Sequence, residues 1–185
     1  PETSNPDTAG TVTGTVDGGY ANMIDAAAGG ASDGMRLAVN VAAMLIAFLG
    51  FIAMIDFLFG LASPGLSLAR VFALVFAPVA VLLGTPTVDV PIVADLLGTK
   101  LVTNELVAYV KLSGEYQDVL SERSRTLATF ALTGFANFGS VGILLGGIGG
   151  MAPTRRADLA RLSMRALLAG FCATLINASI AAVML

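Results

Sequence analysis

The sequence predicts an all-α integral membrane protein that combines transmembrane helices with a re-entrant helical hairpin and a broken transmembrane helix. Hydrophobic residues make up 56% of the 185 residues and charged residues only 12%, about half the charged share of an ordinary soluble domain. Several apolar blocks approach or reach the length that crosses a bilayer. Polar residues and glycines interrupt two of these blocks, which predicts that the backbone opens inside them.

Composition also excludes several classes of function. The net charge is −3 and the chain has no histidine. Nothing therefore indicates nucleic-acid binding, and the commonest general base and metal ligand is missing. The single cysteine, Cys172, lies in an apolar helical pattern, where we expect a small buried hydrophobe that takes no part in a disulfide or a metal cluster. We expect no enzyme activity, no catalytic residue and no metal site.

The chain begins with a polar head at residues 1–34, which contains Asp and Glu but no Lys or Arg. Its first part, to about Gly19, predicts a linker on the cytoplasmic side of the membrane. Residues 21–34 predict a short amphipathic helix against the membrane face, although two glycines weaken it. Because the chain opens with Pro1 and carries no signal peptide, we expect it to be part of a longer protein.

Residues 35–185 predict a transport domain that starts with two apolar helices. Residues 39–61 are long enough to cross the bilayer with some tilt. Their only charge is Asp56, which is either a headgroup-level or helix-packing residue or a carboxylate of the coupling pathway. Residues 67–83 contain Arg70 and Pro78, and this pattern favours an interfacial helix.

Residues 91–113 predict the re-entrant hairpin, with two half-helices that meet at Thr103 and Asn104. Glu105 would lie at the tip, at the N-terminus of the second arm, where the helix dipole favours its carboxylate. It either caps the helix together with Asn104 or accepts hydrogen bonds from solute hydroxyls, and the cost of an ionisable group in a membrane favours a functional role. We expect Lys100 to snorkel or to pair with a charge, and not to bind a ligand.

Residues 125–151 predict the broken crossing. No charged residue occurs between Thr126 and Thr154, while Asn137, Gly139 and Ser140 stand in the middle of this apolar run. Opened helix ends at that depth offer unpaired N–H and C=O groups to a polar solute. The glycines of the second half permit close helix approach. The pattern therefore predicts a solute carrier with its binding site near the middle of the membrane.

The last crossing is predicted at residues 158–185. An arginine cluster precedes and overlaps its start, at Arg155, Arg156, Arg161 and Arg165. Arginines at the end of a membrane helix favour the cytoplasmic side, and we prefer that role to substrate contact. With one crossing after them, the C-terminus is expected outside a plasma membrane or a bacterial inner membrane that the protein spans several times.

Five blocks, in order, resemble the C-terminal half of concentrative nucleoside transporters. They are residues 22–34, the run Gly-Thr-Lys-Leu-Val-Thr-Asn-Glu-Leu-Val-Ala-Tyr at 98–109, Leu-Ser-Glu-Arg-Ser-Arg at 120–125, residues 134–150 and residues 155–170. The resemblance covers nearly the whole chain from about Tyr20. It implies the second re-entrant hairpin and a broken crossing of a homotrimeric transporter that carries nucleosides inward with sodium or protons.

Carried over by motif, the resemblance implies that Glu105, Asn137 and Ser140 bind the ribose hydroxyls and that Phe135 lines the pocket. Family members usually have Phe where Leu106 stands here, a departure that concerns packing beside the tip. The nucleobase site and the site of the coupling ion, sodium or proton, are implied to lie mainly upstream of Pro1. The expected partners are thus nucleosides, the lipid bilayer, the N-terminal half of the same transporter and two further copies of it, with no covalently bound cofactor.

Carboxylate, amide and hydroxyl groups fit this assignment independently, because together they pair with hydroxyls that both donate and accept. One alternative is a membrane-embedded gate-type structural module of the same architecture that transports no nucleoside. It would not require Glu105, Asn137 and Ser140 to converge. An intramembrane enzyme is disfavoured because no histidine is present to activate Ser140 and the candidate carboxylates are not clustered in sequence.

Overall fold

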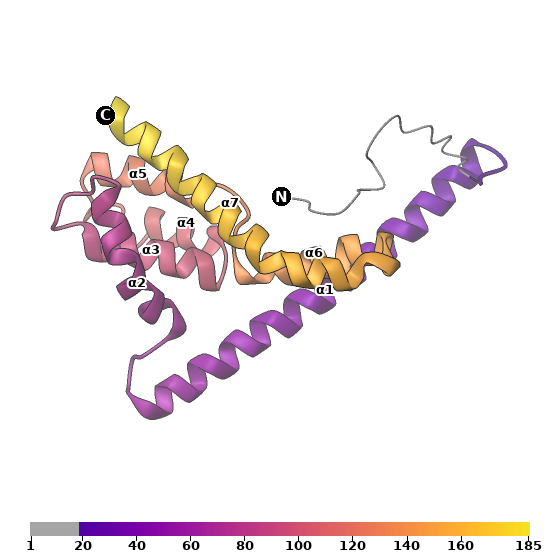
Figure 1. Ribbon diagram of the computed structural model, residues 1–185, viewed down its shortest axis with the longest axis horizontal. Coiled ribbons are helices and arrows are strands. Elements are labelled where there is room, and N and C mark those ends of the chain that lie inside the picture. Colours follow the sequence, from indigo (N-terminus) through magenta and orange to yellow (C-terminus); the bar gives the residue numbers. More distant parts are fainter. Residues whose placement is uncertain (1–18) are drawn as a thin grey trace. The chain divides into compact units, whose positions relative to one another are not determined.

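The computed structural model describes residues 19–185, so the predicted linker at the start of the chain lies outside the described residues. Within this range the chain is helical and forms no strand (Figure 1). The helices are α1 (Met23–Ala62), α2 (Leu68–Leu82), α3 (Val90–Val102), α4 (Glu105–Ser113), α5 (Glu122–Leu132), α6 (Phe138–Met151), the short 3-10 helix η1 (Pro153–Arg155) and α7 (Arg156–Met184). The chain divides into two units, Pro1–Arg36 and Leu37–Leu185.

Helix α1 begins at a well-defined cap. The Asn22 side chain accepts hydrogen bonds from the backbone N–H groups of Ile24 and Asp25, and the Asp25 carboxylate accepts one from Ala21. The helix then continues to Ala62. The sequence had suggested a separate short helix at 21–34 before the crossing at 39–61. No proline interrupts it. Flanking alanines offset the glycines, each of which weakens a helix by about 1 kcal/mol.

Two stretches of the described chain are long and apolar enough, by length and composition, to cross a membrane. They are Met23–Ala62 and Pro153–Met184. The run at 125–151 is not one helix, because residues 133–137 separate α5 from α6. The break that the sequence predicts in this crossing is therefore present.

The start of α2 is held by two side chains. Ser67 caps the helix by accepting a hydrogen bond from the N–H of Arg70, and Asp56 of α1 accepts one from the N–H of Leu68 at 2.6 Å. A carboxylate at a helix N-terminus compensates both the free N–H groups and the helix dipole. Of the two roles that the sequence left open for Asp56, this contact supports the structural one.

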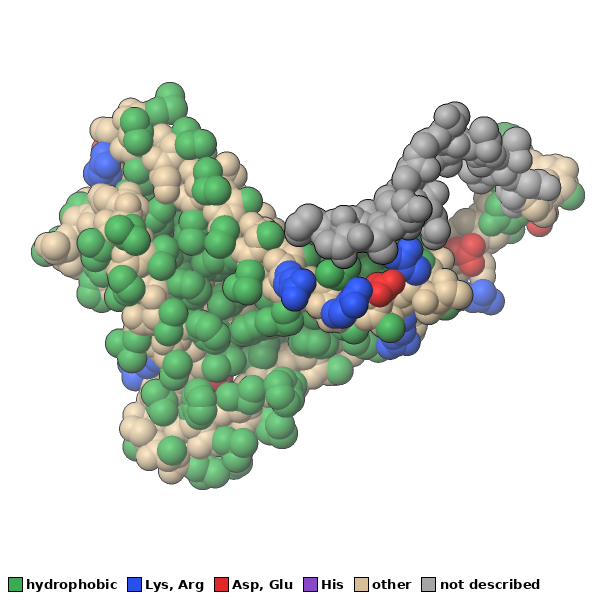
Figure 2. Space-filling view, in the orientation of Figure 1, with side chains coloured by type: hydrophobic (Ala, Val, Ile, Leu, Met, Phe, Trp, Pro, Cys, Tyr) green, Lys and Arg blue, Asp and Glu red, His purple; other side chains and the backbone are tan. Residues whose placement is uncertain are grey.

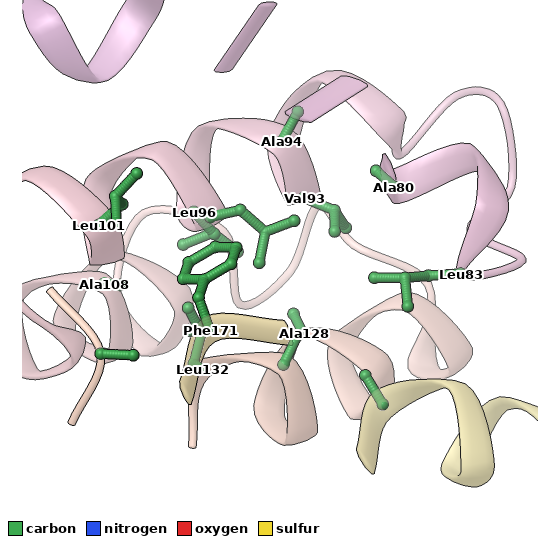
Figure 3. Packing of buried hydrophobic residues seen from close by; sticks show 14 of the residues in the cluster. Ala80, Leu83, Val93, Ala94, Leu96, Leu101, Ala108, Ala128, Leu132 and Phe171 are labelled. Atoms are coloured by element: carbon green, nitrogen blue, oxygen red, sulfur yellow. The ribbon is translucent and has the colours of Figure 1, made fainter. Parts of the chain in front are cut away.

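Helix α3 is the most buried element of the unit Leu37–Leu185. Val93, Leu96 and Val102 have no exposed surface, and Leu96 packs toward Phe171 of α7 and Leu132 of α5 (Figure 3). Gly98 allows α2 to approach α3, because a Cβ atom there would lie 2.5 Å from the backbone oxygen of Ala69. Burial on all sides makes α3 a rigid support for the turn that follows it.

Helices α5 and α6 lie one after the other along α7, in the opposite direction. Near the start of α5, the Arg123 guanidinium donates to the backbone oxygen of Ala182 close to the end of α7, at 2.9 Å. Next to the break, Gly170 of α7 faces Ala136, and at the end of α6 Gly149 faces Arg156. A continuous helix thus supports both halves of the broken one.

The arms α3 and α4 are joined by a polar cluster at their base. The Lys111 ammonium of α4 forms an ion pair with Asp95 of α3, and the Tyr116 hydroxyl donates to the same carboxylate at 3.1 Å. Burial, together with the negative charge of Asp95, raises the pKa of Tyr116 far above its usual value. The cluster holds the two arms together at the end away from the Thr103 to Asn104 turn.

The prediction that Cys172 is buried is wrong, because its side chain is exposed. The buried positions of α7 in this region are Leu167, Phe171, Thr174 and Ala178, a helical spacing that turns Cys172 to the opposite face. Figure 2 shows that hydrophobic side chains predominate on the surface seen in that view.

Candidate functional site

The turn between α3 and α4 positions Glu105. Helix α3 ends at Val102, and Asn104 adopts an extended backbone with φ −169° and ψ 171°. The Asn104 side chain accepts a hydrogen bond from the N–H of Val107 at 2.9 Å and so caps α4. Glu105 is the first residue of α4, where the positive end of the helix dipole stabilises a carboxylate.

The break between α5 and α6 positions Asn137 and Ser140. Gly134 has φ +83°, a left-handed conformation that favours glycine, and it turns the chain away from α5. Asn137 then caps α6: its Oδ1 accepts from the N–H of Ser140 at 2.8 Å, while its own backbone N–H donates to the Ser140 Oγ at 3.4 Å. This capping box gives hydrogen-bond partners to backbone N–H groups at the start of α6. From the sequence we expected these two residues to contact the solute, and their role as a cap was missed.

The two helix starts meet. The Asn137 Nδ2 donates to Oε2 of Glu105 at 3.0 Å, and the backbone oxygen of Thr103 lies near Gly139, 3.9 Å from where a Cβ atom would be. Asn137 and Ser140 are 2% and 3% exposed, whereas Glu105 is half-buried. Residues 32 to 35 positions apart in sequence are therefore brought into one cluster, with the N-termini of α4 and α6 both next to the Glu105 carboxylate.

The cluster keeps hydrogen-bonding capacity for a ligand. A carboxylate has about four acceptor positions, and the hydrogen bond from Asn137 occupies one of them. An amide nitrogen carries two protons, so one remains on Asn137. The Ser140 proton is used within the cap and its oxygen accepts from the Asn137 N–H, which leaves one acceptor position on that oxygen. The arrangement suits a solute with neighbouring hydroxyl groups.

Phe135 lies in the same break but is 54% exposed, and its place in a pocket stays a prediction. The ring of Phe138, one residue beyond Asn137, borders an apolar hollow of about 280 Å³. The hollow lies between α1, α2 and α6 and is lined by Phe48, Phe51, Ile52, Ile55, Leu68, Phe72 and Phe138. A shared polar cavity for Glu105, Asn137 and Ser140 likewise stays a prediction.

Lys100 has a role that its place in the sequence does not indicate. It does not snorkel to the surface: its side chain is completely buried, and its ammonium donates to the backbone oxygens of Ala131 and Thr133 and to Thr174. The first two oxygens belong to the end of α5, where helix carbonyls lack partners. No sequence pattern indicates which cation reaches a helix end 31 residues away.

Within the described residues, no group of three or more His, Cys, Asp or Glu side chains is placed to hold a metal ion. The acidic residue of the cluster, Glu105, is paired with an amide.

The chain is similar to known transporters in sequence and in fold. A family described as "Na+ dependent nucleoside transporter C-terminus" matches residues 1–182. An "uncharacterized transporter" of Haemophilus influenzae is 47% identical over 170 residues, which cover 86% of this chain and 41% of that protein. Sodium/nucleoside cotransporter 1 of Sus scrofa is 41% identical over 182 residues, or 88% of this chain and 28% of that protein. A variant of CNTnw in an outward-facing state aligns with a TM-score of 0.80 at 39% identity, over 89% of this chain and 43% of that chain.

These similarities confirm the predicted all-α integral membrane fold class. The chain spans less than half the length of each of these relatives. The insertion of α3 and α4 into the membrane as a re-entrant hairpin is not tested by them and stays a prediction.

The double role of Asn137, as a cap and as a donor to Glu105, predicts different effects of two substitutions. Asn137→Ala removes both interactions and should lower the free energy of unfolding by about 2 kcal/mol, whereas Asn137→Ser keeps a good cap and should lower it by about 1 kcal/mol. Thermal or denaturant unfolding of the full-length protein in detergent measures both. Equal losses for the two variants would contradict a capping role.

Proposed function

The chain belongs to the Na+ dependent nucleoside transporter family, and on this premise we propose that it forms the sugar-binding C-terminal half of a symporter that imports nucleosides. The observation that carries the proposal is the 3.0 Å hydrogen bond between Asn137 and Glu105. It joins the turn between two short helices to the opening in a broken helix, the kind of place where transporters bind polar solutes.

The chemistry of the cluster supports a sugar as the recognised part. Two neighbouring ribose hydroxyls donate to free lone pairs of the Glu105 carboxylate, and one of their oxygens accepts the remaining proton of Asn137. The Ser140 oxygen supplies a further acceptor. Because these groups lose water when the solute binds, an analogue without the hydroxyls leaves them unpaired and is rejected. We assign Phe135 to the wall of the same pocket.

We assign recognition of the nucleobase and the binding of the coupling ion, sodium or proton, mainly to the N-terminal half of the same transporter. The working unit is proposed to be a homotrimer in the lipid bilayer. The relatives that the chain matches are more than twice its length, which is consistent with a second half.

Replacement of the Glu105 carboxylate tests the proposal in the full-length transporter. Glu105→Gln removes a charged acceptor, and a hydrogen bond to a charged group contributes about 1.5 to 3 kcal/mol. The affinity for uridine or adenosine should therefore fall by about one to two orders of magnitude. Uptake of radiolabelled nucleoside into proteoliposomes, with binding measured by calorimetry, gives both the rate and the affinity.

Deoxynucleosides provide the control for Glu105→Gln. An analogue that lacks a hydroxyl bound by Glu105 should already bind weakly to the wild type and should lose less on substitution. An equal loss for every substrate would mean that Glu105 only holds the two helix starts together. Unchanged affinity for all of them would likewise mean that Glu105 does not bind the sugar.

We further propose that the start of α7 faces the cytoplasm and the C-terminus the outside. Arg155 and Arg161 both pair with Asp158 at this end of α7, and Figure 2 shows the positive side chains gathered along this part of the chain. Positively charged residues at the ends of membrane helices are retained on the cytoplasmic side.

Cysteine labelling tests this orientation. In a Cys172→Ser background, which removes the exposed native thiol, Thr154→Cys should resist a membrane-impermeant maleimide in intact cells and react after permeabilisation. Labelling of Thr154→Cys from outside intact cells would reverse the proposed topology. A cysteine added after Leu185 is the matched control and should react from outside.

A further inference from the structure

The C-terminal end of α5 forms a cage of oxygen atoms around the ammonium of Lys100. The Nζ atom donates to the backbone oxygens of Ala131 and Thr133, both at 2.8 Å, and to the hydroxyl oxygen of Thr174 at 2.9 Å. The Thr174 hydroxyl gives its own proton to the backbone oxygen of Phe171 at 2.8 Å, so a lone pair is directed to Lys100. All three ammonium protons are therefore used, and none remains for a solute.

The cage replaces the usual partner of a buried charge. An uncompensated ammonium in an apolar interior is very unfavourable, and Lys100 is 0% exposed. Here the compensation comes from the negative end of the α5 dipole, from helix carbonyls, from the face of the Phe171 ring, whose centre is 5.1 Å from Nζ, and from the negative charge of Glu105, which does not bond to the ammonium. In other transporters, carbonyls of this kind at a broken helix coordinate a free cation.

We propose that Lys100 is a tethered cation that permanently fills a monovalent-cation site at the break between α5 and α6, so that this break is held open without a dissociable ion. The site is specific for a primary ammonium, because three acceptors converge on one nitrogen at distances typical of charge-assisted hydrogen bonds. It lies on the opposite side of the break from Glu105, which faces the start of α6.

Removal of the ammonium should leave the cage intact and able to bind a free cation. Lys100→Ala deletes the side chain from Cγ to Nζ, which corresponds to n-propylammonium. Lys100→Met removes the charge, but its apolar side chain fills most of the space that the Lys100 side chain occupies. Lys111 of α4 is the matched control, because its ammonium pairs with the Asp95 carboxylate and not with helix carbonyls.

The test is thermal unfolding of the purified full-length protein in detergent, in chloride salts of n-propylammonium and of tetramethylammonium, which has no N–H group. We expect Lys100→Ala and Lys100→Met to lower the unfolding temperature by on the order of 10 °C in tetramethylammonium chloride. n-Propylammonium at roughly 10 to 100 mM should restore at least half of the loss in Lys100→Ala. It should restore none in Lys100→Met or Lys111→Ala.

The proposal is overturned if n-propylammonium raises neither the unfolding temperature of Lys100→Ala nor the yield of folded Lys100→Ala. This holds whatever the temperature and the yield are without n-propylammonium. An equal gain in Lys111→Ala overturns the proposal as well, because it would reveal a general salt effect. Wild-type stability of Lys100→Met would also overturn it, since the charge would then be dispensable. No nucleoside is present in this measurement, so its outcome is independent of the nucleoside proposal.

Discussion

The structure depends on one constraint: a helix that opens in an apolar environment leaves polar backbone groups at both of its ends. These groups need partners because lipid and packed side chains supply none. At the end of α5 the partner is the Lys100 ammonium, bonded to the oxygens of Ala131 and Thr133. At the start of α6 the partner is Asn137, which caps the helix and contacts Glu105. The positive side chain of Lys100 thus lies at the negative end of α5, and the negative side chain of Glu105 lies near the positive end of α6.

The side chains of Lys100 and Glu105 both come from the pair of short helices α3 and α4. Lys100 lies near the end of α3 and Glu105 at the start of α4, so the turn between them fits into the opening of the crossing. The buried packing of α3 and the ion pair between Asp95 and Lys111 fix the other end of the pair. The acceptors and donors of the proposed sugar site are therefore preorganised, so that few side chains would have to move when a solute replaces water.

Sequence reasoning located the local features and not the long-range ones. The opening in the crossing was predicted because Asn, Gly and Ser within an apolar run have local conformational preferences. Capping by Asn104 and Glu105 was one of the two alternatives for the turn, and not the favoured one. Lys100 was misjudged because its partners are 31 and 74 residues away, and such contacts depend on how the helices pack. The short helix expected at 21–34 is continuous with the crossing for another reason: glycines lower helix stability only slightly when alanines surround them. The two units nevertheless divide close to the predicted boundary, between Arg36 and Leu37. The role of Asn137 and Ser140 as a helix cap was missed because capping a helix and binding a polar solute call for the same types of side chain.

The central claim is that Glu105 and Asn137 act as one unit that binds the sugar. A double-mutant cycle of Glu105→Gln and Asn137→Ser, with nucleoside affinity measured in the full-length transporter, tests it most directly. Residues that share a ligand and a hydrogen bond should be coupled, so the double variant should lose less affinity than the sum of the single losses, by at least about 1 kcal/mol. Losses that add to within about 0.3 to 0.5 kcal/mol would mean that the two residues act separately, and would contradict the claim.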